Sequence, residues 1–165
     1  MSVGSTKASA TACAGAVLIV EDDDEMRSLL VSLVQALGFK NVTPLGRLEP
    51  ALRQLEYQVF SMAIVDLNLG DQDGVSLIAA IRKNPRPEIC RIPVLVASTA
   101  STGSRIRDSI QAGADAFLSK PFSIANLKRQ IDFACTKAAA RPANSTSRTS
   151  QPRSHNSTQD VVELY

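Results

Sequence analysis

Short, wholly apolar runs alternate along the chain with stretches in which apolar residues recur every three or four positions. Runs that are apolar at every position are typical of strands buried on both faces, as in parallel sheets. Helical stretches are indicated where the spacing follows one face of a helix. The pattern predicts strands at 17–20, 41–44, 60–65, 93–97 and 114–119, and helices at 26–37, 48–55, 74–81, 102–112 and 122–136.

This alternation of strand and helix sets the expected fold class. Five strands that are each followed by a helix predict a parallel sheet covered on both faces. Right-handed crossovers then favour a doubly wound, flavodoxin-like (βα)5 three-layer sandwich. In such α/β folds the functional site lies beyond the carboxyl ends of the strands.

Length and composition fit one globular domain with tails. The chain has 165 residues, of which 44% are hydrophobic and 21% charged. We expect a flexible leader at 1–14, a folded domain at 15–137 and a disordered polar tail at 138–165. Within the tail, the apolar segment 161–165 is either a docking peptide or only the end of the chain.

Charge and cysteine content bear on the compartment. The net charge of +2 does not indicate strong nucleic-acid binding. The apolar run 17–20 leads directly into acidic residues, unlike a signal peptide, and no apolar span of about 20 residues occurs. Three scattered cysteines indicate reduced thiols rather than a disulfide framework. We therefore expect a soluble, cytoplasmic protein.

Polar side chains follow four of the five predicted strands. Glu21 and Asp22 come after the first strand, Asp66 after the third, Ser98 after the fourth and Lys120 after the fifth. Because parallel strands end at the same edge of a sheet, these side chains are expected to converge.

Three carboxylates in one cleft repel each other unless a cation neutralises them. Oxygen ligands of this kind suit Mg2+, which binds few carboxylates and completes its shell with water and phosphate oxygens. Asp66, at the centre of the set, can act as a nucleophile toward phosphorus. Lys120 and Ser98 would contact the transferred phosphoryl group.

The acidic run 21–25 also has a simpler interpretation. Acids favour helix N-termini, so Asp23, Asp24 and Glu25 are expected to stabilise the start of the first helix. The same capping role stays open for Glu21 and Asp22 when they are considered alone.

Four segments together resemble the receiver domain of bacterial two-component response regulators, chiefly the single-domain, chemotaxis-regulator kind. They are 17–22, 64–74, 93–98 and 112–122, and the resemblance extends over about residues 15–137. It implies that the protein is a phosphoprotein carrying 4-aspartylphosphate, with Asp66 as the acceptor. It also implies Mg2+ held by Glu21, Asp22, Asp66 and the backbone carbonyl of Asn68, and phosphate contact by Lys120.

The resemblance further implies a switch. Ser98 would move toward the phosphate and Phe117 would swing inward, and the bond between Lys120 and Pro121 would be cis. Thr99 remains an alternative to Ser98 as the switch hydroxyl. Glu21 stands where Asp is more usual in the family, which favours a water-mediated metal contact, and Gly70 stands where Pro is frequent.

The implied function is phosphorelay signal transduction through protein contacts. The phosphodonor would be a sensor histidine kinase or a histidine phosphotransfer protein. The downstream protein would bind the face made by the fourth helix, the fifth strand and the fifth helix, and a homodimer is compatible with the sequence. The chain would not be an enzyme beyond its own phosphorylation and dephosphorylation, and neither DNA nor membrane binding is expected. The small residue Ala100 is expected to leave the phosphoryl group open to water.

Two alternatives remain. A haloacid-dehalogenase-like phosphatase also uses a nucleophilic Asp with Mg2+, but it requires an acid two residues later, where this chain has Asn68. The chain could also be a receiver fragment of a larger DNA-binding transcriptional regulator or hybrid kinase.

Overall fold

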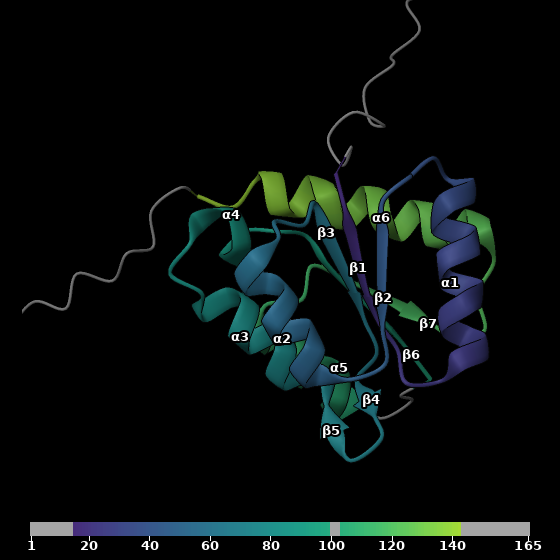
Figure 1. Ribbon diagram of the computed structural model, residues 1–165, viewed down its shortest axis with the longest axis horizontal. Helices are drawn as coiled ribbons and strands as arrows, with labels where there is room; N and C mark the ends of the chain where they lie inside the picture. Colours follow the sequence, from purple (N-terminus) through teal and green to yellow (C-terminus); the bar gives the residue numbers. More distant parts are fainter. Residues whose placement is uncertain (1–14, 100–102, 143–165) are drawn as a thin grey trace, which may run out of the picture.

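The computed structural model describes residues 15–99 and 103–142. The expected leader, Ala100 and residues 143–165 of the expected tail therefore lie outside the described residues. In the parts described, strands and helices alternate as the sequence predicts (Figure 1).

A central sheet of five parallel strands organises the molecule. Its strand order is β2-β1-β3-β6-β7, so the chain runs to one edge of the sheet and then builds outward in the other direction. Neighbouring strands pair in register, with Val20 opposite both Leu45 and Val65. The strands are β1 (Val17–Val20), β2 (Val42–Leu45), β3 (Met62–Val65), β6 (Val94–Ser98) and β7 (Ala116–Ser119).

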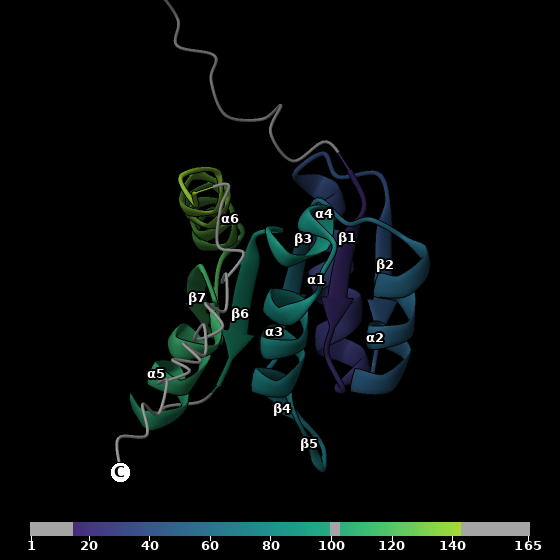
Figure 2. The same ribbon diagram turned by 90° about the vertical axis from the view of Figure 1, so that its left-hand side faces the viewer.

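Helices cover both faces of this sheet. One face packs against α1 and α6, and the other against α2, α3 and the short α4, with α5 beside α3 (Figures 1 and 2). The predicted doubly wound, three-layer sandwich is therefore confirmed. The helices are α1 (Asp24–Ala36), α2 (Leu48–Tyr57), α3 (Gly74–Lys83), α4 (Pro87–Cys90), α5 (Gly103–Ala112) and α6 (Ile124–Ala139).

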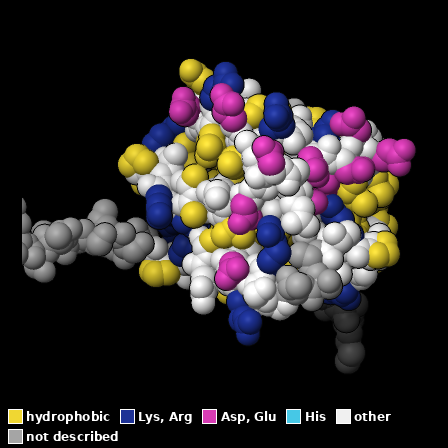
Figure 3. Space-filling view, turned by 90° about the horizontal axis from the view of Figure 1, so that it is seen from below, with side chains coloured by type: hydrophobic (Ala, Val, Ile, Leu, Met, Phe, Trp, Pro, Cys, Tyr) yellow, Lys and Arg dark blue, Asp and Glu magenta, His cyan; other side chains and the backbone are white. Residues whose placement is uncertain are grey.

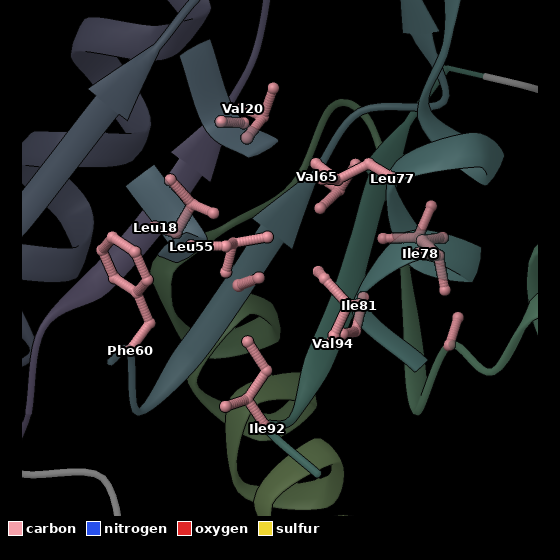
Figure 4. Close-up of a cluster of buried hydrophobic side chains, with 14 of the residues drawn as sticks. Leu18, Val20, Leu55, Phe60, Val65, Leu77, Ile78, Ile81, Ile92 and Val94 are labelled. Atoms are coloured by element: carbon pink, nitrogen blue, oxygen red, sulfur yellow. The ribbon is translucent and has the colours of Figure 1, made fainter. Parts of the chain in front are cut away.

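The apolar core explains why the strands are apolar at every position. In β1, Leu18 and Val20 belong to the cluster under α2 and α3, whereas Val17 and Ile19 belong to the cluster under α1 and α6. Figure 4 shows the first cluster, in which helix side chains such as Leu55 lie over the strands. Burial of one such aliphatic side chain contributes roughly 1.5–3 kcal/mol.

Three short elements, two strands and one helix, were not predicted. Strands β4 (Asn68–Leu69) and β5 (Gln72–Asp73) form an antiparallel hairpin directly after β3. Gly70 turns between them with φ of 69°, a left-handed conformation that glycine adopts without strain. Helix α4 can begin at Pro87, because a residue in the first turn of a helix needs no amide donor.

Element ends differ from the expected ones by a few residues. β3 begins at Met62 although Phe60 is buried, because burial continues outside the hydrogen-bonded strand. Helix α6 ends at Ala139, three residues later than expected. Ile124, the first residue of α6, is 41% exposed although it is apolar, since a residue in the first turn has helical neighbours on one side only.

The cysteine prediction is also corrected. Cys90 is a free thiol, but Cys135 is disulfide-bonded. Its partner is not among the described residues. Spacing along the sequence does not show which cysteines meet in space, so the pattern alone could not reveal this bond.

Among the described residues, no helix combines the length and the apolar character that are needed to cross a membrane.

Candidate functional site

The predicted site lies at the rim where the parallel strands end, the face seen from below in Figure 3. Backbone pairing continues one residue past the strands: Glu21 N–H donates to Leu45 O at 3.0 Å and Asp66 N–H to Val20 O at 2.9 Å. Lys120 N–H likewise donates to Ser98 O at 3.1 Å. These bonds fix the backbone from which the three charged side chains project.

One ammonium group joins two of the predicted acids. Lys120 Nζ donates to Glu21 Oε2 at 2.5 Å and to Asp66 Oδ2 at 2.7 Å. All three side chains are buried, with exposed fractions of 6% for Lys120, 2% for Glu21 and 7% for Asp66. Residues that are 99 and 54 positions apart in the sequence therefore meet here, as the strand-end pattern predicts.

Burial and charge shift the titration of this cluster. Burial raises the pKa of Glu21, and the nearby Asp66 charge adds to that effect, while Lys120 opposes it. Burial also works against the charged form of Lys120, but its hydrogen bonds to Asp66 and Glu21 outweigh that effect and raise the Lys120 pKa. Lys120 therefore remains a cation at neutral pH, between acids that it cannot fully neutralise.

The acidic residues at this rim fit a divalent cation. Glu21, Asp22 and Asp66 each present a carboxylate oxygen, and these oxygens lie within 4.8 Å of one another. Asp22 is exposed, whereas the other two are buried, so solvent can reach the cluster from one side. A few carboxylates with open access to water and phosphate oxygens are the ligands that Mg2+ prefers.

The loop after β3 is built closely around Asp66. Asn68 N–H donates to Asp66 Oδ1 at 2.9 Å, so both Asp66 oxygens have partners. A Cβ added to Gly74 would lie 2.0 Å from the Asp66 carbonyl oxygen, so glycine is required for this close approach. Asn68 itself is exposed at the start of the hairpin.

Two arginines support the site and were missed from the sequence. Arg27 in α1 donates to Glu21 O at 2.8 Å. Arg105 in α5 donates to Leu67 O at 2.8 Å and to Asp73 Oδ1 at 3.1 Å, which ties α5 to the loop carrying Asn68. Both occur on amphipathic helices, where arginines are common on the exposed face, so no sequence signal separates them from surface charges.

The proposed switch residues lie in the neighbouring strands. Ser98 ends β6 fully buried and pairs in register with Ser119, whereas Thr99, the alternative hydroxyl, is exposed. Phe117 lies in β7 opposite Val96 and is partly buried against the core.

Two smaller expectations concern backbone and capping. The bond between Lys120 and Pro121 is cis, as expected. Asp23 caps α1 by accepting from Met26 N–H at 2.7 Å, and Asp24 and Glu25 lie in the first turn. The capping role that stayed open for Glu21 is partly filled, because its Oε1 accepts from Asp23 N–H at 3.2 Å while its Oε2 faces Lys120.

Comparisons with known proteins agree with this geometry. The model of the "Response regulator receiver domain" family matches residues 17–132. Chemotaxis protein CheY-3 of Vibrio cholerae is 31% identical over 116 residues, which covers 70% of this chain and 88% of the relative. A probable chemotaxis protein CheY of Rhizobium etli is 33% identical over 118 residues, with the same coverage of 70% and 88%.

Solved structures show the same fold. A putative response regulator from Chloroflexus aurantiacus superposes with a TM-score of 0.68 at 26% identity, over 74% of this chain and 98% of that one. The receiver domain of the sensor histidine kinase PA1611 from Pseudomonas aeruginosa gives a TM-score of 0.66 at 25% identity, also over 74% and 98%. That receiver domain was solved with a magnesium ion coordinated in its active-site cleft.

Proposed function

The chain belongs to the response regulator receiver family, and from that premise we propose that it accepts a phosphoryl group on Asp66 and passes the signal on by changing its protein contacts. The receiver domain is a signalling module of phosphorelay systems, with a CheY-like fold. One observation carries the residue assignment: Lys120 Nζ contacts both Glu21 and Asp66, at a rim where three carboxylates lie within 4.8 Å.

The proposed reaction moves a phosphoryl group from a histidine nitrogen of the donor to a carboxylate oxygen of Asp66. The phosphorus–nitrogen bond breaks as the phosphorus–oxygen bond forms, and the leaving imidazole nitrogen takes a proton. Lys120, already 2.7 Å from Asp66 Oδ2, is placed to pair with a phosphoryl oxygen. Asn68 N–H, at 2.9 Å from Oδ1, keeps the carboxylate oriented.

Mg2+ is the proposed metal, held by Glu21, Asp22, Asp66 and the backbone carbonyl of Asn68. When bound, it neutralises charge on the phosphoryl oxygens during transfer. The protein's own contribution is positioning, because the backbone bonds at the strand ends fix both Glu21 and Asp66 before any ligand arrives.

Signal output is proposed to run through Ser98 and Phe117. Contact between Ser98 and the phosphate would shift the balance between two packings of the region, and Phe117 would take the vacated space. Because Phe117 lies in β7 beside α5 and α6, the affected surface is the α5–β7–α6 face, where a downstream protein or a second copy of the chain would bind.

The role of a phosphoryl acceptor also suggests the phosphodonor, the compartment and the extent of the domain. The donor is proposed to be a sensor histidine kinase or a histidine phosphotransfer protein that binds near α1, and the compartment to be the cytoplasm. The chain would catalyse only its own phosphorylation and dephosphorylation. The receiver domain is proposed to span about residues 15–137, and the family match over residues 17–132 supports this range.

The proposal is tested by incubating the protein with acetyl phosphate and following the intact mass. With Mg2+ present, the mass should increase by one phosphoryl group, and with EDTA it should not. Asp66→Asn should remove the labelling, whereas Asp71→Asn, which changes an exposed acid in the same loop, should keep it. Labelling that is independent of Mg2+ and persists in Asp66→Asn would contradict the proposal.

A further inference from the structure

A groove runs between α5 and α6, away from the rim that carries Asp66. Its volume is about 210 Å3, and strand β7 forms its floor. We call it the α5–α6 groove, lined by Ser109, Ile110, Ala114, Asp115, Ala116, Phe117, Gln130, Phe133 and Lys137.

Both walls of the α5–α6 groove expose a large apolar side chain. Ile110 of α5 is 54% exposed and Phe133 of α6 is 57% exposed. Apolar residues scattered singly are ordinary on a protein surface, whereas Ile110 and Phe133 line one groove and can contact the same ligand. The floor between them includes Ala116 and the partly buried Phe117.

The charges of the α5–α6 groove favour an acidic ligand. Lys137 lies on its wall and is exposed. Asp115 is the acid of the lining, but its carboxylate already pairs with Arg82 and Arg141 and is buried. The acid in the floor is therefore neutralised, and Lys137 remains as the charge open to a ligand.

The sequence after α6 contains one segment with the complementary chemistry. Residues 160–165 read Asp-Val-Val-Glu-Leu-Tyr, which combines apolar side chains with two acids and no base. Residues 143–159 contain no large apolar residue. Among residues 143–165, segment 160–165 is thus the part that carries large apolar side chains.

The attachment point makes an intramolecular contact favourable. Lys137 precedes Pro142 by about one and a half turns, so the α5–α6 groove lies roughly 8 Å along the chain from where the tail departs. A random-coil chain of about 18 residues has a root-mean-square span of roughly 24 Å. A tether of this length gives an effective concentration on the order of millimolar, so even a weakly binding segment would occupy the groove.

We propose that segment 160–165 docks in the α5–α6 groove of its own chain and competes with other proteins for that face. Ile110 and Phe133 would pack against Val161 and Leu164, and Lys137 would pair with Asp160 or Glu163. The docking itself requires no phosphorylation, so it is tested independently of the function proposed for Asp66.

Backbone amide NMR spectra of the full chain provide the test. The double variant Val161→Ser/Leu164→Ser is compared with wild type, and a linker variant, Thr146→Ala/Ser150→Ala, is the matched control. The double variant should shift the amides of Ile110, Phe133 and Lys137, whereas the control should not. Identical spectra for wild type and the double variant would overturn the proposal.

A synthetic peptide with the sequence of residues 160–165 separates the possible occupants. Added to the double variant, it should restore the wild-type shifts, and Phe133→Ala should weaken its binding by about tenfold. Wild-type shifts that vary with protein concentration would instead identify a second copy as the occupant and overturn the intramolecular proposal.

Discussion

At the scale of single residues, the position of Asp66 depends on the absence of a side chain at Gly74 as well as on the groups that contact its carboxylate. Gly74 opens α3 and donates its N–H to Leu67 O at 3.0 Å, while its Cα lies against the Asp66 backbone. No side chain fits there, because an added Cβ would meet the Asp66 carbonyl oxygen at 2.0 Å and Leu67 Cα at 3.0 Å.

Gly74→Ala should therefore lower the free energy of unfolding by about 3 kcal/mol, since a rigid strand end must move to accept the methyl group. The matched control is Gly103→Ala, where an added Cβ has nothing within 4 Å, and which should change stability by less than about 1 kcal/mol. Urea denaturation measures both. Equal urea midpoints for the two variants would show that the close approach of Gly74 to the Asp66 carbonyl does not determine stability.

The strand-end residues were predictable as a set and not one by one, because a single polar side chain after an apolar run can equally cap a helix or begin a loop. Glu21, Asp66 and Lys120 were found this way, and their contacts appear in the structure. Arg27 and Arg105 were not, because their role depends on which backbone carbonyls lie nearby, and only the folded chain shows that.

At the scale of elements, the opposite end of the sheet is held by a second charge cluster. Asp115, just before β7, has a fully buried side chain that pairs with Arg82 of α3 at 2.8 Å and with Arg141 after α6. It also accepts from Val94 N–H at 2.9 Å. Asp115 thus connects two strands with the ends of two helices.

Removal of Asp115 should be costly. Burial lowers the pKa of Arg82 to about 10 despite the opposing effect of Asp115, so Arg82 stays charged at neutral pH. Asp115→Ala would remove the carboxylate from that cation and leave it only backbone carbonyl acceptors, and we expect a loss of about 3–5 kcal/mol in unfolding free energy. Asp132→Ala, which breaks the exposed pair with Lys128, should cost less than about 1 kcal/mol.

These two variants can be compared by thermal or urea unfolding at neutral pH. If Asp115→Ala unfolds at the same midpoint as Asp132→Ala, the cluster does not stabilise the junction between these elements.

Elements were predicted well where they are long enough for the hydrophobic pattern to repeat, and poorly where they are only a few residues long. All five sheet strands and the five longer helices were predicted, with ends displaced by a few residues. The hairpin of β4 and β5 has two residues in each strand, too few to show a period. Helix α4 is a single turn that begins at Pro87, a residue that normally argues against helix.

At the scale of the whole molecule, the alternation of strands and helices was enough to predict the topology, but not the surface it creates. The sheet order brings β3 between β1 and β6, so Asp66 stands between the acids of β1 and the hydroxyl of β6. The α5–α6 groove depends on how two helices pack across β7, which no local pattern encodes.

The proposed switch of Ser98 and Phe117 involves the whole molecule, because it links the rim that carries Asp66 to the α5–β7–α6 face. Ser98→Ala should still be phosphorylated by acetyl phosphate, since Asp66, Lys120 and the acids remain. Phosphorylation of the variant should, however, change the Phe117 ring signals in NMR much less than in wild type. Thr99→Ala changes the adjacent, exposed hydroxyl and should behave as wild type. If Thr99→Ala lost the Phe117 response and Ser98→Ala kept it, Thr99 would be the switch hydroxyl.

The central claim is that distant side chains meet so that one carboxylate, that of Asp66, accepts the phosphoryl group. The most direct measurement is to label the protein with acetyl phosphate and Mg2+, reduce the acyl phosphate with borohydride, and locate the modified residue by peptide mass spectrometry. Reduction converts a phosphorylated aspartate to homoserine, and we expect homoserine at position 66 and at no other acid. Homoserine at another position, or labelling without any reducible acyl phosphate, would contradict it.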